Sequence, residues 1–359
     1  MNQKLFKSLG WKKSFQKYIK SNDLETSSVG RISAHFGQSY EIITPEKKLE
    51  GILPGSVLYE NNREKFPVVG DMVIIEILEG ENKALIKEVI PRASFLSRKK
   101  PGTMSDEQLI CANIDIIFLV QGLDHDFNVR RLERYLLMAT EMNIEPIIVL
   151  NKTDICEDLE EKINQVRTIA ETIPIITISA HNEDTMEMFT HYLTTGVTGA
   201  FLGSSGVGKS TIINKLLGVE IQKTRAVRED DSKGRHATTV RQLFQLSSGG
   251  MVIDTPGMRE LEPWQAEESL GELFHDIEVL AENCKFNDCT HHHEPGCQVQ
   301  QAIAEGLLAA ERLKSYNKLL REQQYQLSLV DEKAALEKRR QDKEFGKMVK
   351  RIIQEKQLK

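Results

Sequence analysis

The sequence predicts three regions of different class: a small β barrel, a mostly parallel α/β domain and a mostly α-helical region around a cluster of metal ligands. Three observations predict this order. They are short alternating apolar runs between residues 28 and 90, buried strand-like runs alternating with helical stretches from residue 114, and a cysteine cluster near residue 290. At roughly 150 residues per domain, 359 residues form two or three domains. We place the boundaries near residues 102 and 262, giving domains 1–102, 103–262 and 263–359.

The composition is that of a globular chain, with 40% hydrophobic and 28% charged residues. The formal charge of −6 means that any nucleic-acid surface must be a local patch. No apolar run approaches the ~20 residues of a membrane span, and the N-terminus lacks a signal-peptide pattern. We therefore expect a cytoplasmic protein without a membrane segment. A monomer is the default, because no coiled-coil pattern is sustained.

The first region contains five short runs with alternating apolar residues, separated by turn-forming residues: SVGRISAHF, SYEIIT, GILPGSVLY, DMVIIEIL and KALIKEVI. This pattern predicts a five-stranded β barrel. The segment 91–102 follows, and its basic residues lie between two prolines. That composition predicts a linker with a basic face.

The second region alternates buried strand-like runs with helical stretches, one of which runs from Arg130 to Glu141. The runs are IDIIFLV, EPIIVL, IPIITIS and TGAFLG, and RQLFQLS and GMVID complete the set. Such alternation predicts a parallel sheet with crossover helices.

The third region is expected to be helical. One helix is predicted before the cysteine cluster, with Leu270, Leu273, Phe274, Ile277 and Leu280 on one face. A second helix is predicted after the cluster, with Ile303, Leu307, Ala310, Leu313 and Leu320 at roughly helical spacing. Residues 333–359 form a strongly basic tail, which is either a solvated helix or a nucleic-acid contact.

A phosphate-binding loop is the strongest motif. Residues 203–210 read GSSGVGKS, directly after a predicted strand and before the helical run STIINKLL. The backbone N–H groups of such a loop bind phosphates, Lys209 would neutralise the β and γ phosphates, and the Ser210 hydroxyl would bind Mg²⁺. We assign nucleotide binding to Gly203, Ser204, Ser205, Gly206, Val207, Gly208, Lys209, Ser210 and Thr211.

A second motif, NKTD, follows the strand IIVL and comprises Asn151, Lys152, Thr153 and Asp154. A carboxylate here can accept both the ring N–H and the exocyclic amino group of guanine, whereas adenine offers no such donor pair. Asp154 therefore favours GTP over ATP. Ser179 and Ala180 end another strand, where a backbone N–H could support the guanine.

Asp254 and Gly257 belong to a DTPG motif at the end of the strand GMVID. Asp254 could reach Mg²⁺ through water, and the Gly257 N–H could sense the γ phosphate. The polar segment 223–240 is expected to be a switch loop, with Thr238 or Thr239 as the second Mg²⁺ ligand. Because NKTD precedes the phosphate-binding loop and DTPG comes last, the order is that of a circularly permuted GTPase.

Cysteine and histidine residues in the third region have the spacing of a zinc site. Cys284, Cys289, His291 and Cys297 supply four ligands for one tetrahedral Zn²⁺, with no position left for catalysis. The metal would be structural, in a region with little core of its own. His292 and His293 adjoin His291, so the choice of imidazole is open.

Together, the barrel, the order NKTD, SA, GSSGVGKS, HATT, DTPG and the cysteine cluster resemble the small-subunit-dependent GTPases of the RsgA (YjeQ) family. The resemblance covers nearly the whole chain. It implies an OB-fold barrel, a permuted G domain and a zinc domain. It also implies action late in maturation of the small (30S) ribosomal subunit, contact with 16S rRNA, and GTP hydrolysis stimulated by the subunit.

The resemblance also implies a catalytic histidine. Met258 stands where many GTPases carry a water-orienting Gln, and the family's switch-loop histidine matches His236. Ala237 replaces the first Thr of the family's HTTT pattern, which leaves Thr238 and Thr239 for Mg²⁺. A solvated His236 without a catalytic role stays the alternative.

RNA contacts would come from basic residues of the barrel and linker: Arg31, Arg63, Lys65 and the run Arg98 to Lys100. Some OB barrels bind protein instead. Two other functions are open: a GTPase of another RNA process, such as tRNA modification, and a GTP-regulated RNA-binding factor with negligible turnover.

Overall fold

A computed structural model describes most of the chain. The described residues are 6–24, 28–37, 39–55, 66–78, 80–99, 107–182, 186–218, 241–254, 270, 273–286, 289–292 and 294–321. Two compact units result: residues 1–99 with 107–262, and residues 100–106 with 263–359.

The N-terminal strands form the expected five-stranded barrel. They are β1 (Val29–His35), β2 (Tyr40–Ile43), β3 (Lys48–Ile52), β4 (Met72–Ile77) and β5 (Lys83–Val89). The order β1-β2-β3-β5-β4 closes through β1 and β4, and only the β3–β5 pair is parallel. Helix α2 (Lys13–Ser21) buries Phe15 and Ile19 beside Val29 and Met72 of the barrel. The third strand starts at Lys48, earlier than the apolar run had predicted.

A mostly parallel sheet forms the rest of the first unit. Its strands are β8 (Ile116–Gly122), β9 (Glu145–Asn151), β10 (Ile175–Ile178), β11 (Thr198–Gly203), β12 (Gln242–Gln245) and β13 (Met251–Asp254). The order is β10-β9-β8-β11-β13-β12, and only β12 is antiparallel to its neighbour. Every residue of β8 and β11 is buried, which explains their continuous apolar runs. The predicted α/β architecture is confirmed.

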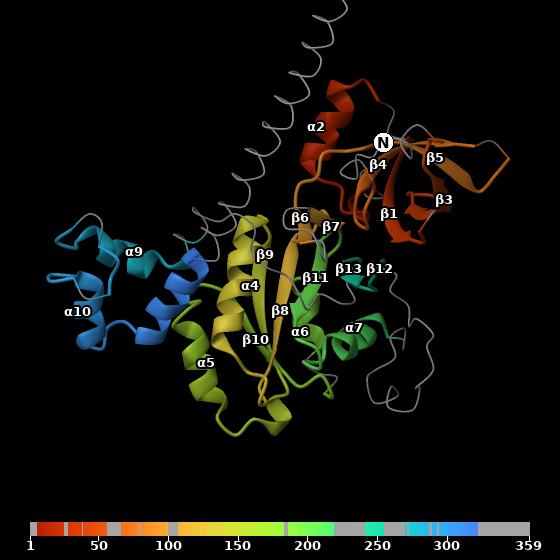
Figure 1. Cartoon of the computed structure of the whole chain (residues 1–359). Coiled ribbons are helices and arrows are strands. Elements are labelled where there is room, and N and C mark those ends of the chain that lie inside the picture. The colour runs from red at the N-terminus through yellow and green to blue at the C-terminus, as the bar shows by residue number, and fades with distance from the viewer. Residues whose placement is uncertain are drawn as a thin grey trace, which may run out of the picture. The chain divides into compact units, whose positions relative to one another are not determined.

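Helices cover both faces of this sheet (Figure 1). On one side lie α4 (Val129–Glu141) and α5 (Leu159–Arg167), and on the other lie α6 (Glu187–Thr190) and α7 (Lys209–Leu217). Phe118 joins strand to helix, because its ring lies 4.8 Å from that of Phe201 and 5.2 Å from that of Phe189. The carboxyl ends of the parallel strands β8, β9, β10 and β11 lie at one edge of the sheet, and parallel α/β sheets bind ligands at this edge.

The barrel and the parallel sheet share one continuous set of strand pairings. Strand β1 pairs with β12 at Ala34 and Gln242, so the 11-stranded sheet runs from β10 through β12 into the barrel. The fully buried side chain of Arg31 lies at this junction. It donates to three backbone carbonyl oxygens, of Leu9 (2.8 Å), Gly70 (3.1 Å) and Asn113 (3.1 Å), and to the Thr198 hydroxyl (3.0 Å).

Arg31 was expected to contact RNA, and that expectation is wrong. Its side chain is 1% exposed, because its donors satisfy carbonyl groups at the junction. Burial lowers the pKa of Arg31 to about 10, so the side chain still carries its charge at neutral pH. Arg31 therefore holds the fold together and presents no charge to a nucleic acid.

Replacing Arg31 with Met should destabilise the first unit by about 3 kcal/mol, because the buried carbonyl groups of Leu9 and Asn113 would lose their donor and that of Gly70 would keep only Asn113 Nδ2. Urea unfolding followed by fluorescence would measure the loss. Arg167→Met is the matched control, since Arg167 is an exposed side chain that also bonds carbonyl groups. Equal stability of the two variants would contradict the structural role of Arg31.

The segment expected to be a basic linker instead contributes a strand. Strand β6 (Phe95–Lys99) pairs antiparallel with β7 (Glu107–Ala112) as a separate two-stranded sheet. The prolines flank this strand and leave its hydrogen-bonding groups intact, and Leu96 and Ser97 are buried in it.

The second unit contains α9 (His275–Glu282), α10 (Gln298–Ala304) and a further helical stretch over residues 310–321. The single helix expected through Ile303 and Leu307 is wrong. Gly306 has φ +75°, a left-handed conformation that ends a helix, and Leu307 is 78% exposed. The later stretch is held by Arg312, which donates to the Asp276 carboxylate at 2.5 and 2.8 Å and lies over the Phe274 ring.

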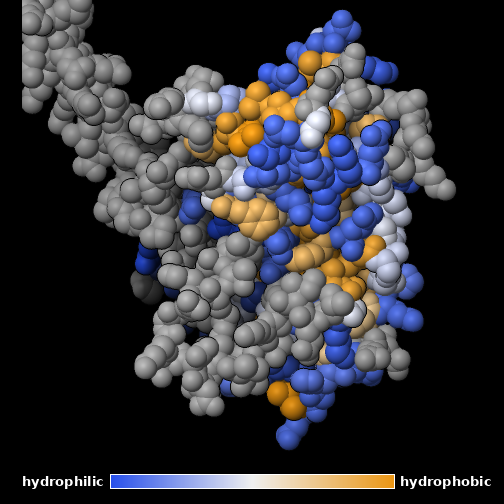
Figure 2. Space-filling model, turned by 90° about the vertical axis from the view of Figure 1, so that its right-hand side faces the viewer, coloured by the Kyte–Doolittle hydropathy of each residue, from blue (hydrophilic) through white to orange (hydrophobic). Residues whose placement is uncertain are grey.

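None of the described helices has the length and apolar character to cross a bilayer. On the face shown in Figure 2, hydrophilic residues cover much of the described surface and apolar residues lie among them.

Candidate functional site

The phosphate-binding loop joins β11 to α7, as its sequence predicted. Gly208 has φ +100°, and a Cβ there would lie 2.2 Å from Asn151 Nδ2, so only glycine fits. The Lys209 ammonium donates to the carbonyl oxygens of Gly203 (2.7 Å) and Ser204 (2.6 Å). The loop is thereby folded around a cation at the N-terminus of α7, an arrangement that suits phosphate.

Asn151 connects three of the motifs. Its Nδ2 donates to the Val207 carbonyl of the phosphate-binding loop at 2.7 Å, and its Oδ1 accepts the Ala180 N–H at 2.9 Å. The side chain is 2% exposed. The NKTD strand, the SA turn and the phosphate-binding loop therefore form one rigid edge, although they are far apart in sequence.

The guanine-directed residues follow Asn151. Lys152 has a left-handed backbone, φ +72°, and its ammonium bonds Asp124 Oδ2 at 2.6 Å. Asp154 is exposed, and a hydrogen bond from Ser179 lowers the pKa of its carboxyl group. Asp154 is therefore a carboxylate at neutral pH and lies on the surface beside the SA turn.

A second cation, Arg131 on α4, also reaches the phosphate-binding loop, and the sequence reasoning missed it. Its guanidinium donates to the Ser204 hydroxyl and to both carboxylate oxygens of Asp126, at 2.9 and 3.0 Å. No motif indicated this contact, since Arg131 lies 73 positions before Ser204. The helical stretch itself was predicted, and the only available signal was a basic residue in its first turn.

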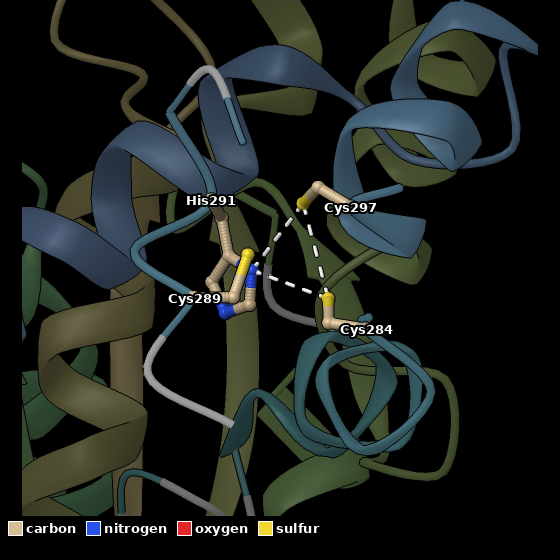
Figure 3. A group of neighbouring side chains, drawn as sticks. All are labelled: Cys284, Cys289, His291 and Cys297. Carbon is tan, nitrogen blue, oxygen red and sulfur yellow. Dashed lines mark hydrogen bonds between the residues drawn. The ribbon is translucent and has the colours of Figure 1, made fainter. Parts of the chain in front are cut away.

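The second candidate site is the cysteine cluster in the other unit (Figure 3). One ligand atom each from Cys284, Cys289, His291 and Cys297 lies within 4.8 Å of the others. The Cys284 and Cys297 sulfurs are 3.9 Å apart, and His291 Nδ1 lies 3.7 and 3.5 Å from them. Ligands of a tetrahedral zinc with Zn–S bonds of about 2.3 Å are separated by about 3.8 Å, so the donor set fits such an ion.

Neighbouring groups fix these ligands. Cys297 is the N-cap of α10, and its sulfur accepts the Gln300 N–H. Gln300 also donates its side-chain amide to the His291 carbonyl at 2.5 Å. His291 faces the sulfurs and is 8% exposed, whereas His292 is exposed. The arrangement identifies His291 as the imidazole of the cluster and could hold a metal ion.

Comparison with known proteins gives the family. The RsgA GTPase family model matches residues 89–264, and a model described as 50S ribosome-binding GTPase matches residues 198–357. "Small ribosomal subunit biogenesis GTPase RsgA 2" of Vibrio vulnificus is 41% identical, over 97% of this chain and 95% of its own length. The chain belongs to the RsgA GTPase family. The RsgA protein of Leptospira interrogans is 40% identical over 97% of both chains.

Solved structures agree with this assignment. The crystal structure of YjeQ from Thermotoga maritima has a TM-score of 0.60 and 26% identity, and covers 82% of this chain and 98% of its own. YloQ, described as a circularly permuted GTPase, has a TM-score of 0.58 and 25% identity, and covers 82% of this chain and 94% of its own. The permuted order inferred from the motifs is thus that of the RsgA fold, and the activity is that of a GTPase, which uses a nucleotide with Mg²⁺.

Several predicted site residues of this RsgA chain lie outside the described residues: His236, Thr238, Thr239, Gly257 and the switch segment 223–240. The same holds for His293, Arg63, Lys65, Lys100 and the basic tail. Asp254 is described as the last residue of β13, and Ser210 and Thr211 lie in the first turn of α7. The roles of all these residues stay predictions.

Proposed function

We propose that this protein is a GTPase that binds the small ribosomal subunit and acts late in its maturation, hydrolysing GTP to GDP and phosphate with stimulation by the subunit. The observation that carries the proposal is the Asn151 bridge between NKTD, the SA turn and the phosphate-binding loop, because it brings together the three segments predicted to bind GTP. We infer the partner from relatives that are named small ribosomal subunit biogenesis GTPases and are similar over nearly the whole chain.

In this proposal the nucleotide is held by three sets of residues. Asp154 accepts the two guanine donors, with support from Ser179 and Ala180. The loop from Gly203 to Thr211 binds the phosphates, and Gly257 senses the γ phosphate. Mg²⁺ neutralises phosphate charge and is held by Ser210, by Thr238 or Thr239, and through water by Asp254. His236 orients the attacking water when the switch segment closes.

The remaining regions provide structure and contacts. Cys284, Cys289, His291 and Cys297 hold one structural Zn²⁺. Domain 1–102 binds RNA, domain 103–262 hydrolyses GTP, and domain 263–359 binds zinc. Arg63, Lys65, the run Arg98 to Lys100 and the basic tail contact 16S rRNA, and the protein acts as a cytoplasmic monomer.

Isolated small subunits should raise the steady-state rate of GTP hydrolysis by about 100-fold or more, the scale on which a completed catalytic group acts. The assay compares the protein alone with small subunits, large subunits and naked rRNA, using ATP as the nucleotide control. His236→Ala should remove most of the stimulation and leave GTP binding intact.

Other outcomes point to other functions. Stimulation by large subunits alone would contradict the small-subunit proposal and agree with the 50S ribosome-binding family match. Stimulation by tRNA or potassium would indicate an RNA-modification GTPase. GTP binding without turnover under every condition would indicate a GTP-regulated RNA-binding factor.

A further inference from the structure

Two cations converge on one residue of the phosphate-binding loop. Lys209 donates to the Ser204 carbonyl oxygen, and Arg131 donates to the Ser204 hydroxyl. Lys209 belongs to the loop motif, whereas Arg131 belongs to α4, 73 positions before Ser204 in the sequence. Because Arg131 is paired with Asp126, it adds hydrogen-bond donors beside Ser204 and little net charge.

The surrounding structure fixes the Arg131 guanidinium in place. Nη1 bonds both carboxylate oxygens of Asp126, and Nη2 donates to the Asp126 carbonyl at 3.0 Å. The Arg131 backbone N–H donates to Oδ1 of Asn128, the N-cap of α4. The Arg131 side chain is 27% exposed and the Asp126 side chain 30%, so the pair stays accessible to a ligand in the loop.

A second residue of α4 lies near Ser204. Tyr135, one turn after Arg131, is 8% exposed, and burial raises the pKa of its hydroxyl against the opposing effects of Arg131 and Ser204. Within the described residues, Nε of Arg131 donates to no group, which leaves a free donor next to the loop.

We propose that Arg131 is a second phosphate-directed cation, which donates to the terminal phosphate of GTP and makes the site prefer the triphosphate over the diphosphate. The proposal rests on the proposed nucleotide site. A planar guanidinium matches the oxygens of a phosphate group, and Asp126 holds it ready in the free protein. Asp126 would otherwise repel the phosphates, so Arg131 also masks a carboxylate next to the loop.

Binding of guanosine, GDP and a non-hydrolysable GTP analogue should separate this role from a structural one. Arg131→Met is expected to weaken the GTP analogue about tenfold and GDP about twofold, and to leave guanosine unchanged, as one charge-assisted hydrogen bond to the terminal phosphate requires. Arg131→Lys keeps the charge and should recover part of the preference for the triphosphate. Arg167→Met, on α5, removes the same charge where no loop contact exists and should change nothing.

An equal loss of affinity for the analogue and for GDP, or no loss of either, would overturn the proposal. A residue that only supports the fold of the loop would change the affinity of all phosphate-bearing ligands by the same factor. If Arg131→Met does not fold, Arg131→Gln repeats the test with a neutral polar side chain. Failure of the parent protein to bind any guanine nucleotide would instead overturn the proposed function.

Discussion

Asp154→Asn is expected to weaken GTP binding by about a thousandfold and to make xanthosine triphosphate the preferred nucleotide. The carboxylate accepts two guanine donors, whereas an Asn side chain offers one acceptor and turns its amide donors toward the guanine amino group. Sites built on paired donors and acceptors can reject a mismatched ligand by about 10⁴-fold or more, because polar groups are left unpaired. Xanthine carries a carbonyl group at that position and accepts a hydrogen bond from the new amide.

Equilibrium binding of GTP, xanthosine triphosphate and ATP would measure this change. Asp158→Asn is the matched control, because Asp158 lies four residues later and pairs with Lys162 at 2.8 Å on the surface. The control should keep the guanine preference. Equal losses for GTP and xanthosine triphosphate in Asp154→Asn would show that Asp154 supports the fold of the site and does not read the base.

Cys297→Ala is expected to remove the bound zinc and to unfold the described part of the second unit. Cys297 supplies a ligand and also caps α10, so the variant loses the metal and the start of the helix together. A structural zinc contributes on the order of 10 kcal/mol to a small domain, more than this region could recover from its few buried apolar residues.

Zinc content and limited proteolysis of the purified variant would test this prediction. The second unit should become sensitive to protease, and GTP binding by the first unit should persist. Cys156→Ala is the control, since Cys156 lies outside the cluster and, among the described residues, bonds Asp158 and Lys162. One equivalent of zinc and full protease resistance in Cys297→Ala would contradict a structural metal site.

The sequence predicted the strands of the barrel and of the parallel sheet, because each depends on local information, but it did not predict β6 and β7. Buried runs such as IDIIFLV have no other stable place, and loops such as GSSGVGKS occur in one strand–loop–helix setting. The helix through Ile303 failed for the opposite reason. Its apolar spacing continued past Gly306, but a left-handed glycine ends a helix whatever the pattern around it.

The sequence also could not predict contacts between side chains that lie far apart in the chain. Arg31 looked like an RNA contact because its charge was visible and its burial was not. Arg131 looked like an ordinary helical residue, since its contact with Ser204 exists only when α4 packs against β8 and β9. Composition and periodicity report which face of an element is apolar, and they carry no information about the distant group that a polar side chain meets.

The pairing of β1 with β12 also sets an order for folding as the chain is synthesised. Ala34 and Gln242 are about 200 residues apart, whereas the other partners of β1, in β2 and β4, follow within a few tens of residues. The barrel strands can pair early in synthesis. The part of β1 that pairs with β12, at Ala34, stays unpaired until β12 has been translated. An uncovered strand edge can pair with other chains. A nascent chain with a finished barrel is therefore most prone to aggregation in the interval before β12 emerges.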